Sequence, residues 1–475
     1  MTNDRRRDVT MEILKKEYKD VWASYTEKDK KDLFDYAERY RRFISRCKTE
    51  RECVRDMIKI AKENGYEDLE DLIKSEKKIN PGAKVYANYN DKALVMFCVG
   101  KESLTQGLNI LGAHLDSPRL DLKPNPLYED SGFAMFKTHY YGGIKKYQWV
   151  AIPLAIHGVV VKKSGEVIDI NIGEDENDPV VGVSDLLIHL SKDQMEKKLG
   201  VAIAGEDLNI CLGSIPIRDE EEKDQVKANI LVLLNEKYGI VEEDLVSAEI
   251  QIVPAGPARD YGLDRSMLIG YGQDDRVCAY ASLEAQLEVQ NPDKTTVTIL
   301  VDKEEVGSMG ASGMQSRFFE NTIGELLNLA GEYSGLNLSR TLAKSKMLSS
   351  DVTAGYDPNF PSVMDKYNSA YFGKGVVFNK YTGARGKSGS SEASAEYVAQ
   401  LRRIMDQENV TWQTSEMGKV DQGGGGTIAY ILANFGMDVI DCGVPVHSMH
   451  APWEITSKAD LYEMKKAYIA FLKHA

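Results

Sequence analysis

The chain has 475 residues, which at roughly 150 residues per domain indicates two or three domains. Its 59 basic and 73 acidic residues give a net charge of −14, so it is not expected to bind nucleic acid, which requires a concentrated basic surface. A hydrophobic fraction of 43% with a charged fraction of 28% is typical of a soluble globular protein and excludes a disordered or fibrous chain. The longest apolar stretch, 150–161, is interrupted by Pro153 and His157 and is too short for the roughly 20 residues that span a bilayer, so no membrane partner is expected.

The N-terminus and the cysteines indicate the compartment. The chain begins MTNDRRRD with no apolar run behind it, so no secretory signal is expected. Six cysteines are scattered without a CxxC pair, and several lie in apolar segments. Reduced, buried cysteines in a cytoplasmic protein explain this pattern better than disulfides or a cysteine-bound zinc ion.

The predicted elements change in character along the chain. Residues 1 to about 80 are charged, with apolar residues at three- and four-residue spacings that predict helices, and short strands follow from Lys84. The segment 126–246 combines β-rich pieces, a predicted helix over 184–198 and an acidic run, and we interpret it as an inserted domain. After about 247, apolar strands alternate with helices, which favours an α/β fold with a central mixed sheet flanked by helices. The expected division is therefore one α/β domain in two parts, 1–125 and 247–475, around the insertion 126–246.

Histidines and acids lie at the carboxyl ends of the predicted strands. In open α/β sheets, ligands bind beyond these ends, so side chains that separate segments deliver there are expected to meet at one edge. A further acid pair opens the helix that follows the extended piece MLIGYGQ. The residues concerned are His114 and Asp116, Asp274 and Asp275, Glu304 and Glu305, Asp351, and His450.

These residue types suit a site for two metal ions. Zinc binds imidazole nitrogen and carboxylate oxygen, and two zinc ions about 3.5–4 Å apart need a shared anionic ligand. Two histidines, two aspartates and one glutamate supply a histidine and an acid for each ion and a bridge between them. A further carboxylate can take a proton from the attacking water. The pair Glu304–Glu305 offers one carboxylate for the metal and one for the water. The short spacing from His114 to Asp116 lets the aspartate fix the imidazole ring.

Each residue also has an ordinary explanation when it is taken alone. The joint pattern favours the metal, because only seven histidines exist and two lie at strand ends. Two carboxylates that leave an apolar strand together also destabilise the fold unless something uses them. The ordinary explanations are a core or surface histidine for His114, a solvated pair for Glu304–Glu305, a helix cap for Asp274–Asp275 and a turn cap for Asp351.

Other catalytic motifs do not match. The sequence has no HExxH and no GxSxG, and the segment 383–388 has two residues where a phosphate-binding loop has four between its glycines. The glycine run 423–426 either binds an anion through backbone N–H groups or lets another segment of the chain approach closely. The pattern leaves both explanations open.

Six motifs in a fixed order resemble one protein family. GAHLDSPR, GQDDR, VDKEEVGS, SSDVTAGYDPN, GGGGT and VPVHSMHA are similar to the motifs of the aspartyl aminopeptidase family, which includes the vacuolar aminopeptidase I type. The resemblance extends from about Lys84 to the end of the chain. It implies a cytosolic aminopeptidase with two co-catalytic zinc ions and the α/β fold of co-catalytic zinc exopeptidases. It further implies that the insertion is a β-rich dimerisation domain and that dimers assemble into a tetrahedral dodecamer.

The resemblance also implies a role for each residue of the cluster. One zinc ion has two ligands of its own, the other has two, and a single carboxylate bridges them. Of two further acids, one takes a proton from the water and the other orients the ring of a ligand histidine. The implied roles are His114 and Asp351 on one ion, Glu305 and His450 on the other, Asp274 as the bridge, Glu304 as the general base and Asp116 as the partner that orients His114.

Three further residues are expected near the substrate. His189 in DLLIHL resembles the family's histidine that enters a neighbouring subunit's active site, as a substrate contact or an accessory metal ligand, although its own segment predicts an ordinary helical position. Lys374 resembles a pocket lysine, and the alternative is a solvated lysine beside a glycine turn. Gly424 lies in the glycine run. The family's WxDR element after YGG is missing here, so an acidic and a neutral or apolar preference for the N-terminal side chain both stay open.

Together these features predict a metallo-aminopeptidase that removes the N-terminal residue of peptides. Two zinc ions per subunit are expected, which cobalt or manganese can replace because first-row metals share these ligands. The expected partners are peptides with a free N-terminus and further copies of this chain. The alternatives are a related dinuclear metallohydrolase, such as a deacylase or carboxypeptidase, and a non-catalytic scaffold, which would be expected to have lost ligands.

Overall fold

The structure, a computed structural model, describes residues 16–218 and 221–475. Two segments lie outside this description, residues 1–15 and residues 219–220. The first contains the N-terminal sequence discussed above and the start of the predicted helical region, and the second lies within the acidic run. The described start of the chain is helical as predicted. Thr26 and Thr49 begin its two long helices with capping boxes, in which the threonine and the acid three residues later satisfy each other's backbone N–H groups. The helices are α2 (Val21–Ser24), α3 (Glu27–Arg46), α4 (Glu50–Glu63) and α5 (Leu69–Lys74).

Within the described residues, nine strands form the central sheet, in the order β1-β2-β3-β13-β4-β14-β20-β16-β18. Its middle is parallel, with β4 (Asn109–His114) between β13 (Thr296–Val301) and β14 (Lys346–Ser349), and with β20 (Asp438–Gly443) beyond β14. These strands are almost entirely buried, as expected for parallel strands covered on both faces. The outer strands are β1 (Glu67–Asp68), β2 (Lys84–Tyr89), β3 (Ala93–Cys98), β16 (Val376–Asn379) and β18 (Trp412–Thr414), and β3 and β16 join the parallel group in antiparallel register.

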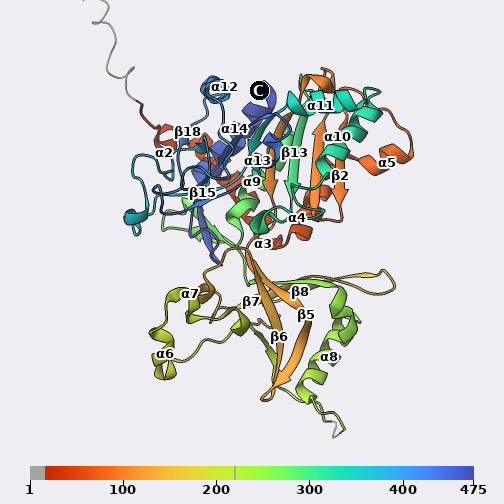
Figure 1. The fold of residues 1–475 in the computed structure, drawn as a ribbon, viewed down its shortest axis with the longest axis vertical. Helices are drawn as coiled ribbons and strands as arrows, with labels where there is room; N and C mark the ends of the chain where they lie inside the picture. The colour runs from red at the N-terminus through yellow and green to blue at the C-terminus, as the bar shows by residue number, and fades with distance from the viewer. Residues whose placement is uncertain (1–15, 219–220) are drawn as a thin grey trace, which may run out of the picture.

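Helices cover both faces of the central sheet (Figure 1). The mixed α/β fold predicted from the sequence is therefore confirmed. Every helix in the described residues is too short or too polar to cross a membrane. One apolar cluster includes residues of α3, α4, α9 (Gln273–Glu288), α12 (Ala395–Gln407) and α14 (Lys458–His474), and a second includes residues of α5, α10 (Phe318–Leu329), α11 (Gly335–Ala343) and α13 (Ala429–Ala433).

A second sheet forms a separate lobe, at the bottom of Figure 1. Its six antiparallel strands, all in the described part of the chain, follow the order β8-β7-β10-β5-β6-β9, and they have their own apolar cluster. Helix α8 (Gln225–Tyr238) packs on this sheet. The strands extend slightly beyond 126 and 246 on either side, and the division into domains stays a prediction. The strands are β5 (Arg119–Asp130), β6 (Phe133–Tyr141), β7 (Leu154–Val161), β8 (Val167–Ile172), β9 (Ile210–Gly213) and β10 (Ala248–Pro254).

The prediction of a single helix over 184–198 is wrong. This segment contains only a 3-10 turn (Ile188–Leu190) and the short α6 (Lys192–Met195), with α7 (Leu199–Ala202) after it. A short helix is stable only when its apolar face packs against a partner. Here Ile188 and Leu190 are each 69% exposed and Met195 is 71% exposed, so the apolar positions that suggested a helix have no partner within the described chain.

Two smaller sheets surround the edge of the central sheet where the site residues were expected. The larger has the strand order β11-β12-β22-β21-β15, and the smaller pairs the glycine run with the segment that failed to match a phosphate-binding loop. The strands are β11 (Arg259–Tyr261), β12 (Met267–Gly270), β22 (Glu454–Ser457), β21 (Pro445–His447) and β15 (Thr353–Ala354), and β17 (Gly383–Ala384) with β19 (Gly424–Gly425).

Candidate metal centre

The predicted ligands meet at the carboxyl edge of the parallel strands. His114 is the last residue of β4, and Asp351 follows β14 by two residues. The loop after β13 carries Glu304 and Glu305, and Asp274 lies in the first turn of α9. A cavity of about 530 Å³ is lined by Asp274, Glu304, Glu305, Asp351 and His450, together with residues of the glycine run. Segments far apart in the sequence therefore deliver four acids and His450 to one cavity.

Asp274 lies between the two histidines. Its Oδ1 is 3.1 Å from Nε2 of His114, and its Oδ2 is 3.1 Å from Nε2 of His450. Glu305 Oε1 lies 3.5 Å from the same His450 nitrogen. One carboxylate thus presents an oxygen to each imidazole.

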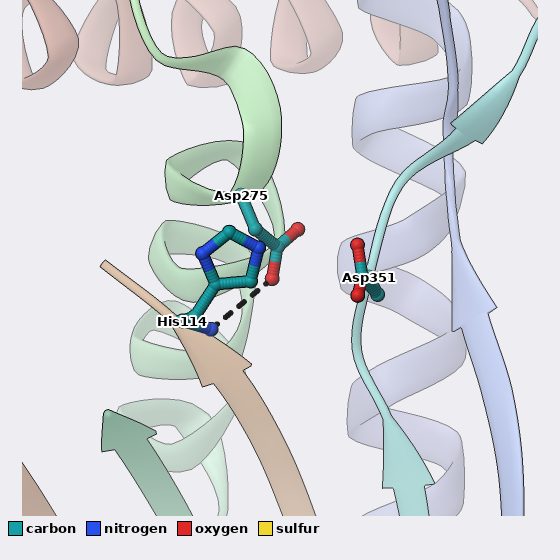
Figure 2. Close-up of side chains that lie close together, drawn as sticks. All are labelled: His114, Asp275 and Asp351. Carbon is teal, nitrogen blue, oxygen red and sulfur yellow. Dashed lines mark hydrogen bonds between the residues drawn. The ribbon is translucent and has the colours of Figure 1, made fainter. Parts of the chain in front are cut away.

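Two groups of side chains have the ligand types and the spacing of a metal site. His114, Asp274 and Glu305 form one group, and His114, Asp275 and Asp351 form the other; within each group the ligand atoms all lie within 4.8 Å of one another. Figure 2 shows the second group, with His114 from the end of β4 beside Asp275 of α9, and Asp351 facing them from the segment after β14. Imidazole and carboxylate are ligands that zinc prefers, so the residues present fit this ion.

Sequence reasoning placed Asp275 with the converging acids but assigned it no role beyond a possible helix cap. In the structure Asp275 is buried, its Oδ2 accepts a hydrogen bond of 3.3 Å from the backbone N–H of His114, and its Oδ1 has no hydrogen-bond partner. Asp275 therefore belongs to the wall of the site. The doubled acid in GQDDR was the available signal, but nothing in the sequence showed that both acids point inward.

The electrostatics of the cluster also suit a bound cation. Burial raises the pKa of Glu304 to about 7, and it raises the pKa values of Glu305 and Asp351 well above the usual range, with the charge of nearby aspartates adding to the effect. Burial opposes a charge on His450 too, but its hydrogen bond to Asp274 raises the histidine's pKa to about 10. A bound cation stabilises the ionised form of buried acids that repel one another, and it therefore lowers their pKa values.

Asp116 contacts more of the site than the ring of His114. The His114 Nδ1 lies 3.0 Å from the backbone carbonyl oxygen of Asp116 and 3.3 Å from its Oδ1. The Asp116 carboxylate also accepts hydrogen bonds from the backbone N–H groups of Glu304 (3.1 Å) and Glu305 (3.2 Å). Asp116 therefore connects the ends of two neighbouring strands.

The lobe built on the six-stranded sheet reaches the same site. Tyr141, the last residue of β6, donates a hydrogen bond of 2.8 Å from its hydroxyl to Asp116 Oδ2. His450 Nδ1 lies 3.0 Å from the carbonyl oxygen of Gly143, which can accept its hydrogen. A ligand histidine commonly bonds a carbonyl through its other nitrogen, because this bond fixes the tautomer and the ring. Neither contact was predicted, since no pattern in the sequence places Tyr141 beside Asp116.

The three residues expected near the substrate have different positions. Gly424 lines the cavity, and its φ is +152°; a Cβ added there would lie 2.1 Å from the carbonyl oxygen of Gly383. The close approach of β17 thus requires a glycine at this position. Lys374 is 3.2 Å from Asp20 Oδ2 and is not among the described residues that line the cavity. His189 is exposed, in the 3-10 turn Ile188–Leu190, and is not among the described residues that line the cavity.

Comparisons with known proteins agree with this fold and site. The family model described as "Aminopeptidase I zinc metalloprotease (M18)" matches residues 43–472. A protein of Clostridium acetobutylicum named "Probable M18 family aminopeptidase 1" is 63% identical over 461 residues, which cover 97% of this chain and 99% of that protein. The crystal structure of an M18 family aminopeptidase from Thermotoga maritima is 45% identical, with a TM-score of 0.92 over 97% of this chain and 100% of that chain.

A more distant structure, the mApe1 dodecamer of S. cerevisiae, shares the fold at 21% identity with a TM-score of 0.75, covering 93% of this chain and 97% of that chain. The fold and the close relatives define the protein as a zinc-dependent aminopeptidase. The chain belongs to the M18 family of aminopeptidases. The resemblance described from the six motifs is therefore confirmed.

Proposed function

We propose that this aminopeptidase holds two zinc ions per subunit, with Asp274 as the bridge between them. The observation that carries the proposal is the position of the Asp274 carboxylate, with one oxygen 3.1 Å from His114 Nε2 and the other 3.1 Å from His450 Nε2. His114 and Asp351 would complete one site, and Glu305 and His450 the other. Zinc would supply Lewis acidity that polarises the scissile carbonyl, lowers the pKa of water and helps to hold the free amine of the substrate. Cobalt or manganese are expected to replace it, because they take the same ligands.

We assign the proton transfer to Glu304. Its Oε2 lies 3.9 Å from His114 Nε2, on the cavity wall, and burial raises its pKa to about 7. An acid with a pKa near the working pH exchanges protons most effectively. Glu304 takes a proton from the attacking water and delivers it to the amine that leaves. Asp116 keeps the Glu304 backbone and the His114 ring in place.

The substrate side of the proposal involves Gly424, Lys374 and His189. Glycines of the run line the cavity, and we assign the stabilisation of the developing oxyanion to their backbone N–H groups, a large contribution in acyl transfer. Lys374 is a candidate for the pocket of the N-terminal side chain, although its ion pair with Asp20 already offsets part of its charge. His189 would reach the cavity of a neighbouring subunit, as a substrate contact or an accessory metal ligand.

We further propose that the chain is a cytoplasmic homo-oligomer, in which the second lobe mediates dimers that assemble into a dodecamer. The segment that contains His189 supports this proposal, because Ile188, Leu190 and Met195 expose apolar surface in the single chain. The six cysteines are free, and five are buried, which suits a reducing compartment. Light scattering coupled to size-exclusion chromatography measures the assembly, and a monomer at micromolar concentration would contradict it.

Hydrolysis of a panel of aminoacyl-p-nitroanilides tests the activity. The panel contains Asp, Glu, Leu, Met, Lys and Ala, and each is measured before and after chelation and with zinc, cobalt or manganese restored. Chelator-sensitive release is expected, and the ranking decides between an acidic and a neutral or apolar preference. Acetylating the substrate amine is expected to stop the reaction, because an aminopeptidase needs a free α-amine. Equal turnover of the acetylated peptide would favour a deacylase or carboxypeptidase instead.

A further inference from the structure

Glu454 is a buried acid beside the proposed metal ligands. Neither the sequence motifs nor the proposed reaction uses it. It is the first residue of β22, and it pairs with Gly270, the last residue of β12. The chain passes from Gly270 directly to the start of α9, where Asp274 lies. Four residues before Glu454 is His450. The register of these strands therefore places the Glu454 side chain between two segments that each carry a proposed ligand.

The two carboxylate oxygens of Glu454 bond one segment each. Oε2 accepts a hydrogen bond of 3.1 Å from the backbone N–H of Asp274, and Oε1 accepts one of 2.7 Å from the backbone N–H of His450. A single rigid group thus fixes the separation between the backbone of the bridging acid and that of a ligand histidine.

The backbone of His450 needs such support. Its φ is +64°, in the left-handed region that a residue with a Cβ rarely adopts. A backbone held in that region persists only when its surroundings stabilise it. The hydrogen bond from the His450 N–H to Glu454 is one such contact, and the bond from its ring to the Gly143 carbonyl is another.

Backbone groups of the site, rather than a basic side chain, hold the carboxylate of Glu454. Its side chain is 1% exposed, and no lysine, arginine or histidine in the described residues forms an ion pair with it. Burial of a carboxylate without a cation destabilises a fold. Its two acceptor oxygens nevertheless match two backbone donors that belong to the metal site, which gives this carboxylate a use.

We propose that Glu454 is a positioning residue that sets the affinity of the zinc site formed by Glu305, His450 and the bridging Asp274. This inference rests on the two-zinc site proposed above. Removal of a group that orients a metal ligand without binding the metal typically lowers metal affinity or activity by about 10–100-fold.

Substitution of Glu454 by glutamine tests the proposal with little change in volume. A carboxamide has one acceptor oxygen, and its NH₂ group is a donor. Either orientation of E454Q places that donor against a backbone N–H, so one of the two contacts is lost. The expected result is one zinc ion bound normally and the other bound about 10–100-fold more weakly, as measured by competition with a chromophoric chelator. The turnover number is expected to fall with little change in KM, and added zinc is expected to restore it.

Asp460 offers a matched control. It is also buried, at 0% exposed, and its two oxygens accept hydrogen bonds from the backbone N–H groups of Gly373 (2.8 Å) and Gly375 (2.7 Å). D460N removes the same kind of contact in a segment that contributes no residue to the metal cluster. It is expected to lower the unfolding temperature and to leave both zinc affinities within twofold of those of the wild-type protein.

Several results would overturn the inference or the proposal beneath it. E454Q with wild-type affinity for both ions contradicts the role of Glu454, as does D460N with an equal loss of zinc. A wild-type protein that binds one zinc ion per subunit contradicts the two-zinc proposal itself. Should E454Q not fold, E454D is the second variant: it keeps both acceptors but shortens their reach, and weaker binding of one zinc is again expected, whereas unchanged binding of both contradicts the inference.

Discussion

Substitution of Glu304 by glutamine separates the proposed base from the proposed ligands. Glutamine has nearly the same size, and the backbone N–H of residue 304 keeps its 3.1 Å hydrogen bond to Asp116 Oδ1, so the loop is expected to keep its shape. The variant loses the ability to accept a proton. A positioned general base contributes about 10²–10⁴-fold to the rate. At about 1.36 kcal/mol for each factor of ten, E304Q is expected to raise the activation free energy by about 2.7–5.4 kcal/mol.

The neighbouring Glu305 provides the contrast. Its Oε1 lies 3.5 Å from His450 Nε2 and has no hydrogen-bond partner among the described residues, as expected of an atom placed to bind a cation. E305Q replaces an anionic ligand by a neutral one and is expected to lose zinc. The two substitutions have the same chemistry at adjacent positions, so a difference between them reports on position alone.

The assay combines turnover with zinc analysis. The turnover number is measured on the best p-nitroanilide of the panel, and zinc per subunit is measured on the same samples after gel filtration. E304Q is expected to retain wild-type zinc with turnover lowered at least a hundredfold, and E305Q to contain less zinc. Full zinc with more than a tenth of the wild-type turnover in E304Q would refute the assignment of Glu304 as the base. Zinc loss in E304Q but not in E305Q would show that Glu304 is the ligand and Glu305 the base.

Two further predictions concern the junction between the lobes. Y141F removes the hydroxyl that bonds Asp116 and is expected to destabilise the protein by about 1.5–3 kcal/mol, the usual value for a hydrogen bond to a charged group, and to lower kcat/KM; unchanged kinetics would show that the second lobe does not support the site. Burial lowers the pKa of His157, but its hydrogen bonds to Glu174 and Glu52 raise that pKa overall. Protonated His157 therefore stabilises the folded protein fully below the unfolded pKa of about 6.5, and this contribution is lost as the pH rises through the folded pKa. H157Q is therefore expected to lower the unfolding temperature more at pH 6 than at pH 9, and an equal effect at both pH values would contradict this.

The meeting of several of these acids with His114 could be predicted, because it follows from strand order. His114 and Asp351 end parallel neighbouring strands, and the acids after β13 emerge at the same edge. An apolar strand that ends in acids is visible in a sequence, and parallel strands bring such ends together. The proximity of these side chains therefore follows from the correct assignment of a few strands, and their roles as ligands stay a proposal.

The supporting contacts could not be predicted, because their partners are backbone groups. Glu454 and Asp116 bond backbone N–H groups, which every residue except proline possesses, so the sequence does not specify which ones they meet. Tyr141 reaches the site only because β6 returns beside β5 in the second sheet. The failed helix around His189 has the opposite cause, since its apolar residues suggested burial that the single chain does not provide.

The central claim is that two zinc ions share the Asp274 carboxylate. Anomalous scattering from a crystal of the purified protein, recorded on both sides of the zinc absorption edge, tests it most directly. We expect two peaks per subunit about 3.5–4 Å apart, with Asp274 between them, one beside His114 and the other beside His450. A single peak, or two peaks with Asp274 bound to only one of them, would contradict the claim.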